Sequence, residues 1–131
     1  MNIINEIKDL NLPFGKYVII GSGILDALNI RKAIDIDIAV LPDLFSQLQK
    51  TGEWNEEIKY NQVFLSKDSI EITPKLSWDK YNTTTEEAIA SATIIESIPF
   101  MNLKELCKFK QALGRKKDMK DIELIKRYLR I

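Results

Sequence analysis

The sequence predicts an α/β (α+β) protein in which helices flank a small mixed, mainly antiparallel sheet. Short β-branched or alternating runs, separated by turn residues, fill the centre of the chain. Apolar residues at helical spacing mark both ends instead. The 131 residues are enough for one domain with a proper core and too few for two. We therefore expect residues 1–131 to form a single domain.

The first half of the chain is expected to alternate between helices and strands. The unbroken apolar run Tyr17–Ile20 predicts a strand that is buried on both faces. Pro42 cannot donate to a sheet ladder and should end the second strand, and Asp43 is the expected N-cap of the next helix. The predicted elements are helices over residues 2–10 and 24–28, strands over 17–20 and 34–41, and a short helix closed by residues 51–52.

The second half begins with strands and ends with helices. Residues 92–95 and 98–101 resemble two strands, although one continuous helix over residues 85–97 is an alternative. A capping-box relation between Asn102 and Glu105 marks the start of the next helix, and Gly114 should end it. The other predicted elements are strands over residues 58–60, 62–66 and 70–72 with a turn at 67–69, a loop over 74–84, a short helix over 86–90 that starts at Thr85, and a last helix with Asp118 and Asp121 as capping residues.

Composition excludes several classes of function. Basic and acidic residues both number 19, so the formal charge is zero, which argues against a broad nucleic-acid or lipid surface. The chain has no His and one Cys, which excludes His-based zinc sites, a His general base and an internal disulfide. Cys107 lies in a helical pattern and is expected to be a small buried residue. The N-terminus has no long apolar run, so we expect a cytoplasmic protein without membrane contact.

Two acidic residues stand on one expected strand. Side chains alternate along a strand, so Asp35 and Asp37 should project from the same face about 7 Å apart. Like charges this close repel each other, so a divalent metal ion is the expected partner. Glu71 lies between two isoleucines and faces away from them. If its strand pairs beside residues 34–41, Glu71 should point toward the same face and complete a triad.

These residues suit phosphoryl transfer from a nucleotide. Gly21 and Ser22 lie at a turn between a strand and a helix, where backbone N–H groups and the helix dipole favour phosphate oxygens. Asp35 and Asp37 are hard oxygen ligands of the kind that magnesium prefers. Glu71 would be a third ligand or the base for the attacking hydroxyl. Three carboxylates are able to hold a pair of metal ions together with the phosphates.

The order of an apolar strand, Gly21-Ser22, twelve residues and Asp35-Ile36-Asp37 resembles the signature of the nucleotidyltransferase superfamily, whose fold is similar to the catalytic core of DNA polymerase β. Residues 98–125 are similar to the tail of small prokaryotic members related to abortive-infection toxins. The resemblance implies that Gly21 and Ser22 hold the triphosphate and that Asp35 and Asp37 bind Mg²⁺ or Mn²⁺. It also implies a third acid, usually Asp, for which Glu71 is the best-placed match.

Basic and aromatic residues offer further candidates for the nucleotide site, each with an alternative. Arg31 contacts phosphate or pairs with Asp35 or a surface acid. Lys110 and the run 115–117 neutralise phosphate, or the run is solvated surface at a helix C-terminus. Trp78 and Tyr81 stack on a base or ribose, or they form a hydrophobic cover over the sheet.

The leading expectation is a magnesium-dependent nucleotidyltransferase. It would move a nucleoside monophosphate from a nucleoside triphosphate to an acceptor hydroxyl and release pyrophosphate. The acceptor is a protein, a tRNA or a small molecule, and a partner protein could supply its site. The alternative is a catalytically inert nucleotide- or partner-binding module of a toxin–antitoxin or phage-defence system.

Overall fold

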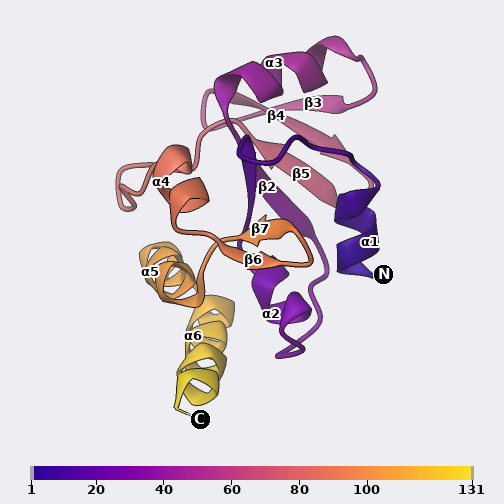
Figure 1. The fold of residues 1–131 in the computed structure, drawn as a ribbon. Coiled ribbons are helices and arrows are strands. Elements are labelled where there is room, and N and C mark those ends of the chain that lie inside the picture. Colours follow the sequence, from indigo (N-terminus) through magenta and orange to yellow (C-terminus); the bar gives the residue numbers. More distant parts are fainter. Residues whose placement is uncertain (1, 131) are drawn as a thin grey trace.

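A single mixed sheet of seven strands with helices around it forms the domain in the computed structural model, which describes residues 2–130 (Figure 1). No helix within these residues is long and apolar enough to cross a membrane. The elements in chain order are α1 (Ile3–Lys8), β1 (Tyr17–Ile20), α2 (Gly23–Ala27), β2 (Ile36–Val40), α3 (Pro42–Lys50), β3 (Asn55–Lys59), β4 (Gln62–Lys67), β5 (Ile70–Thr73), α4 (Thr85–Ala90), β6 (Thr93–Ile95), β7 (Ile98–Phe100), α5 (Leu103–Leu113) and α6 (Lys116–Leu129).

The strand order is β3-β4-β5-β2-β1-β7-β6. Strands β1 and β2 are antiparallel, β2 and β5 are parallel, and β1 and β7 are parallel. The remaining three pairs are antiparallel, so the predicted mixed, mainly antiparallel sheet is confirmed. The central strands are buried on both faces, as the unbroken run Tyr17–Ile20 predicted. Antiparallel β1 and β2 and parallel β2 and β5 bring the end of β1 and the starts of β2 and β5 to one edge.

The C-terminal helices α5 and α6 pack against each other beside this edge (Figure 1). The side chain of Asn102 accepts a hydrogen bond from the Glu105 backbone N–H at 2.8 Å and caps α5. Gly114 follows α5 with a φ of +67°, a left-handed conformation that suits glycine, so the predicted end of this helix is confirmed. Only two residues separate α5 from α6, which keeps the helices adjacent.

Several predicted boundaries and caps are wrong. Strand β2 begins at Ile36, so Asp35 lies one residue before it. Asp43 is not an N-cap, because Pro42 opens α3. Thr84 rather than Thr85 caps α4, through a capping box. The two strands predicted over residues 92–95 and 98–101 are confirmed as β6 and β7, and the alternative of one continuous helix over residues 85–97 is wrong.

The start of α6 also differs from the expectation. Arg115 is the N-cap residue, and Asp118 stands three positions later, where its carboxylate accepts the backbone N–H of Arg115 at 3.1 Å. Asp118 therefore stabilises the helix start from inside the first turn. The run 115–117 directly follows the C-terminus of α5, as the solvated-surface alternative expected, but it also opens α6, where the dipole disfavours cations.

Candidate functional site

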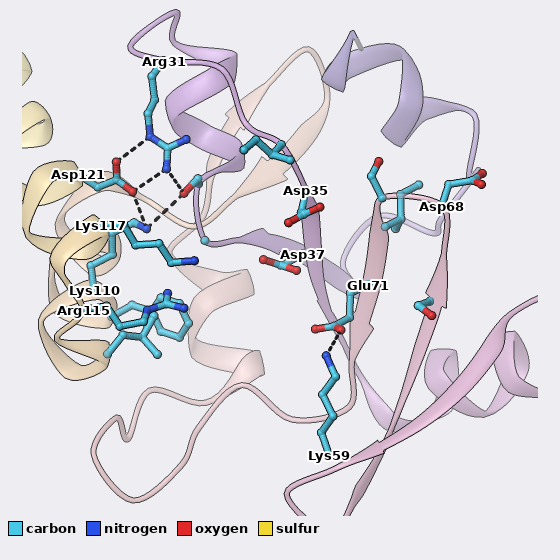
Figure 2. Close-up of a pocket in the computed structure, with 18 residues that line it drawn as sticks. Arg31, Asp35, Asp37, Lys59, Asp68, Glu71, Lys110, Arg115, Lys117 and Asp121 are labelled. Atoms are coloured by element: carbon cyan, nitrogen blue, oxygen red, sulfur yellow. Dashed lines mark hydrogen bonds and ion pairs between the residues drawn. The ribbon is translucent and has the colours of Figure 1, made fainter.

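A polar cavity of about 540 Å³ lies between the sheet edge and helices α5 and α6 (Figure 2). Most charged side chains on its sheet side are acidic, and most on its helix side are basic. Sequence positions that lie up to a hundred residues apart meet here. All the site residues predicted from the sequence line this one cavity: Gly21, Ser22, Arg31, Asp35, Asp37, Glu71 and Lys110.

Gly21 forms the turn after β1 with a φ of +64°. A Cβ atom there would lie 3.4 Å from Oδ2 of Asp37, so glycine allows the turn to pass close to the acid. Gly23 opens α2, and a Cβ at this position would come within 2.5 Å of the Ile19 side chain. Both glycines are therefore required by local geometry, and they keep the turn that carries Ser22 tight against the sheet.

The acidic side of the cavity is set by strand register. Asp37 of β2 and Glu71 of β5 are direct partners in a parallel pair, so their side chains project from the same face. This pairing is the one on which the predicted triad depended. Asp35 lines the same cavity from just before β2 (Figure 2).

Among the acids that line the cavity, Asp37 has the most perturbed pKa. Burial, together with the negative charges of Glu71 and Asp35, raises its pKa from 3.8 to about 6. Lys59 and Lys110 act in the opposite direction and do not compensate. A positive charge bound beside Asp37 would therefore stabilise its ionised form.

Lys59 holds the third acid. Its ammonium group lies 2.6 Å from Oε2 of Glu71, and this contact raises the pKa of Lys59. Strand β4 separates β3 from β5, so the lysine spans one strand to reach its partner. Lys59 was missed from the sequence, because a basic residue at the end of an exposed strand carries no local sign of such a contact.

Arg31 is anchored in a buried network and does not pair with Asp35. Its guanidinium donates two hydrogen bonds of 2.7 Å to the carboxylate of Asp121, which is 3% exposed. It also donates to the hydroxyl of Ser22 at 2.8 Å (Figure 2). Asp121 is therefore a buried ion-pair partner and not a capping residue. A planar bidentate contact of this kind fixes the orientation of both groups.

Lys110 joins the same network from α5. It is 4% exposed, and its ammonium group lies 2.8 Å from Asp121 and 3.4 Å from Asp118. The third contact is a 3.2 Å hydrogen bond to the Ser22 hydroxyl. Burial raises the pKa of Asp118, but hydrogen bonds from Arg115 and the charge of Lys110 outweigh this and lower it below its ordinary value.

The network leaves the Ser22 proton available. A serine hydroxyl has two acceptor lone pairs and one donor hydrogen. Arg31 and Lys110 both donate to this oxygen, and within residues 2–130 no acceptor takes its hydrogen. Because Ser22 lines the cavity, its remaining capacity is to donate to a bound anion.

Two more cations face the acids from the start of α6. Arg115 lines the cavity and is paired with Asp118 at 2.6 Å. Lys117 also lines it and points toward Asp37 in Figure 2, and it takes part in none of the ion pairs found within residues 2–130. Cations at a helix N-terminus are unfavourable for the helix, and Asp118 compensates the charge of Arg115 but not that of Lys117.

The donor set suits magnesium only with help from a ligand. Across residues 2–130, no three acidic or cysteine side chains are placed to hold a metal ion by themselves. Magnesium typically uses one or two carboxylates and completes its shell with water and substrate phosphates. Asp35 and Asp37 fit that pattern.

Aromatic residues near the site divide into two groups. Tyr81 is 1% exposed, and its ring packs edge-on against Phe109 at 5.1 Å between centroids. It therefore belongs to the hydrophobic cover. Trp78 is 40% exposed and lines a second cavity.

The chain was compared with models of protein families, with curated proteins and with solved structures, and none of them matches it.

Proposed function

We propose that this protein is a magnesium-dependent nucleotidyltransferase that moves a nucleoside monophosphate from a nucleoside triphosphate to an acceptor hydroxyl. The observation that carries the proposal is the division of one cavity into an acidic side on β2 and β5 and a basic side on α5 and α6. A polyphosphate requires cations along its length and carboxylates for its metal ions. Both are present within one cavity.

The basic side would bind the phosphates. Ser22 donates its hydroxyl hydrogen to a phosphate oxygen, while Lys117 and Arg115 neutralise its charge. Lys110 and Arg31 act from behind, since their charges are already matched by Asp121 and their contacts hold Ser22 in place. This arrangement fixes the end of the triphosphate that leaves as pyrophosphate.

The acidic side would carry the reaction. Asp35 and Asp37 would hold the metal, which when bound supplies positive charge at the α-phosphate and its neighbouring oxygens. The acceptor oxygen forms a bond to the α-phosphorus as the bond to the bridging oxygen of pyrophosphate breaks. The acceptor proton passes to Glu71, whose carboxylate is oriented by Lys59.

The test is incubation with radiolabelled ATP, CTP, GTP or UTP and Mg²⁺ or Mn²⁺ in the presence of cell extract. Pyrophosphate release and a labelled acceptor are the expected products. The double variant Asp35→Asn, Asp37→Asn should lose both. Asp79→Asn is the matched control, because Asp79 is exposed and lines neither cavity. Unchanged product formation by the double variant would contradict the proposal.

A catalytically inert nucleotide- or partner-binding module is the second candidate. The observation that favours it is the 2.6 Å ion pair between Lys59 and Glu71, which engages the candidate base. Such a module, for example in a toxin–antitoxin or phage-defence system, would bind nucleoside triphosphates without releasing pyrophosphate. Binding of nucleoside triphosphates without pyrophosphate release in the assay above would favour the inert module, and pyrophosphate release would favour the enzyme.

A further inference from the structure

A second cavity, of about 380 Å³, adjoins the polar one. Asp37 and Glu71 line both cavities and therefore stand at their border. The second cavity is mainly apolar, and its volume lies in the range of small-molecule sites. Its lining includes four aromatic side chains: Tyr60, Phe64, Trp78 and Phe109.

The two cavities differ in charge. Arg31, Lys110, Arg115 and Lys117 line the polar cavity, and none of them lines the apolar one. Lys75 is the only basic residue among those that line the apolar cavity within residues 2–130. A ligand that fills both cavities must therefore be anionic at one end and flat and apolar at the other.

Two of the aromatic side chains are held in exposed positions by the backbone. Trp78 exchanges two backbone hydrogen bonds with Tyr81, of 2.7 and 2.9 Å, and is nevertheless 40% exposed. Tyr60 and Asn61 form the two-residue turn between β3 and β4 with φ values of +52° and +59°. Asn and Gly are the usual residues of such turns, and a bulky residue there is strained.

The strained Tyr60 is 87% exposed, and its ring lies 6.4 Å from the ring of Phe64. Folding alone does not account for an exposed aromatic ring in a left-handed turn. Bases stack on exposed aromatic faces with little dependence on sequence, since every base has a π-face. A flat ring in this cavity would cover Trp78 and Tyr60.

We infer that the apolar cavity binds the base of the nucleoside triphosphate whose phosphates occupy the polar cavity. The inference rests on the proposed function, because it places the α-phosphate at the border, beside Asp37. The ribose then bridges the two cavities, and the base contacts the aromatic side chains. Recognition by stacking predicts that all four nucleoside triphosphates bind with similar affinity.

Calorimetric titration of the Trp78→Leu variant tests the inference. Tripolyphosphate and each of the four nucleoside triphosphates are titrated in the presence of Mg²⁺. Loss of one stacking contact is worth about 1–3 kcal/mol, so nucleotide affinity should fall about 5- to 150-fold. Affinity for tripolyphosphate should stay the same. Phe14→Leu is the matched control, because Phe14 is exposed and lines neither cavity.

Fluorescence provides a second measurement that does not depend on removing Trp78. The chain has two tryptophans, and Trp54 is buried beneath the ammonium group of Lys67, outside both cavities. In a Trp54→Phe variant, Trp78 is the single reporter. Its emission should change with nucleoside triphosphates and stay constant with tripolyphosphate.

The outcomes separate the inference from the proposed function. Tripolyphosphate and the nucleotides could both bind while Trp78→Leu leaves nucleotide affinity unchanged and Trp78 emission does not change with nucleotide. The base would then lie elsewhere, and the inference would be wrong. If the unmodified protein binds neither probe, the proposed function fails, and the inference fails with it.

Discussion

Substitution of Asp37 by Asn is expected to stabilise the metal-free protein at neutral pH. Burial, Glu71 and Asp35 raise the pKa of Asp37 from 3.8 to about 6. Because the folded-state pKa lies above the unfolded one, the folded chain binds the proton more tightly. The contribution of Asp37 to stability is therefore most favourable below pH 4 and is lost as the pH rises through about 6. The difference between a pKa of 3.8 and one of about 6 corresponds to a penalty of roughly 3 kcal/mol for ionised Asp37.

Asn has nearly the shape of Asp and carries no charge, so the variant should escape this penalty. The difference in the free energy of unfolding should be close to zero below pH 4 and should grow to about 3 kcal/mol in favour of the variant above pH 7. Urea unfolding from pH 4 to pH 8 with a metal chelator measures this difference. Asp79→Asn is the control, because Asp79 is exposed and lines neither cavity.

Two results would refute this reasoning. A difference that does not vary with pH would mean that packing, and not ionisation, distinguishes Asp from Asn at this position. A variant that is less stable than the unmodified protein at pH 8 would mean that Asp37 is already paired with a positive charge. When magnesium replaces the chelator, the unmodified protein should gain stability and the variant should not.

Three further substitutions test the charged groups around the cavity. Lys110→Met leaves buried carboxylates without their shared cation and should cost about 3–5 kcal/mol in urea unfolding, and adding Asp121→Asn should recover part of the loss. Gly21→Ala should cost about 1 kcal/mol in the same assay, since its φ is +64°. Lys59→Met frees Glu71 and removes a positive charge that acts on Asp37, so the magnesium affinity measured by calorimetry should rise.

The sequence was sufficient for β1 and for Asp37 on β2, because both depend on local patterns. An unbroken β-branched run identified β1 to the residue. The triad depended on one further condition, the pairing of β5 beside β2, and the structure meets that condition with Asp37 opposite Glu71. Asp35 illustrates the limit of the pattern, because the strand begins one residue after it and side-chain alternation does not place it.

The buried ion network could not be predicted in the same way. Arg31 and Asp121 are 90 residues apart, and Ser22 and Lys110 are 88 residues apart. Nothing in a local pattern distinguishes these charges from solvated ones, and Asp121 was assigned to a cap because an acid near a helix start commonly has that role. Lys59 was missed for the same reason, since only the three-dimensional sheet brings it to Glu71.

Burying the charges around the cavity costs free energy, and the stability of the fold does not require these charges. Well-packed apolar side chains would often be as favourable as buried ions such as Lys110 and Asp121, and the ionised Asp37 carboxylate destabilises the fold. Arg31 and Lys110 hold the hydroxyl of Ser22 in place. A bound positive charge would offset the repulsion between Asp37 and its acidic neighbours. Because both costs fall when a metal-bound polyphosphate enters, ligand binding should raise the melting temperature, and the largest gain should occur where Asp37 is ionised, above pH 6.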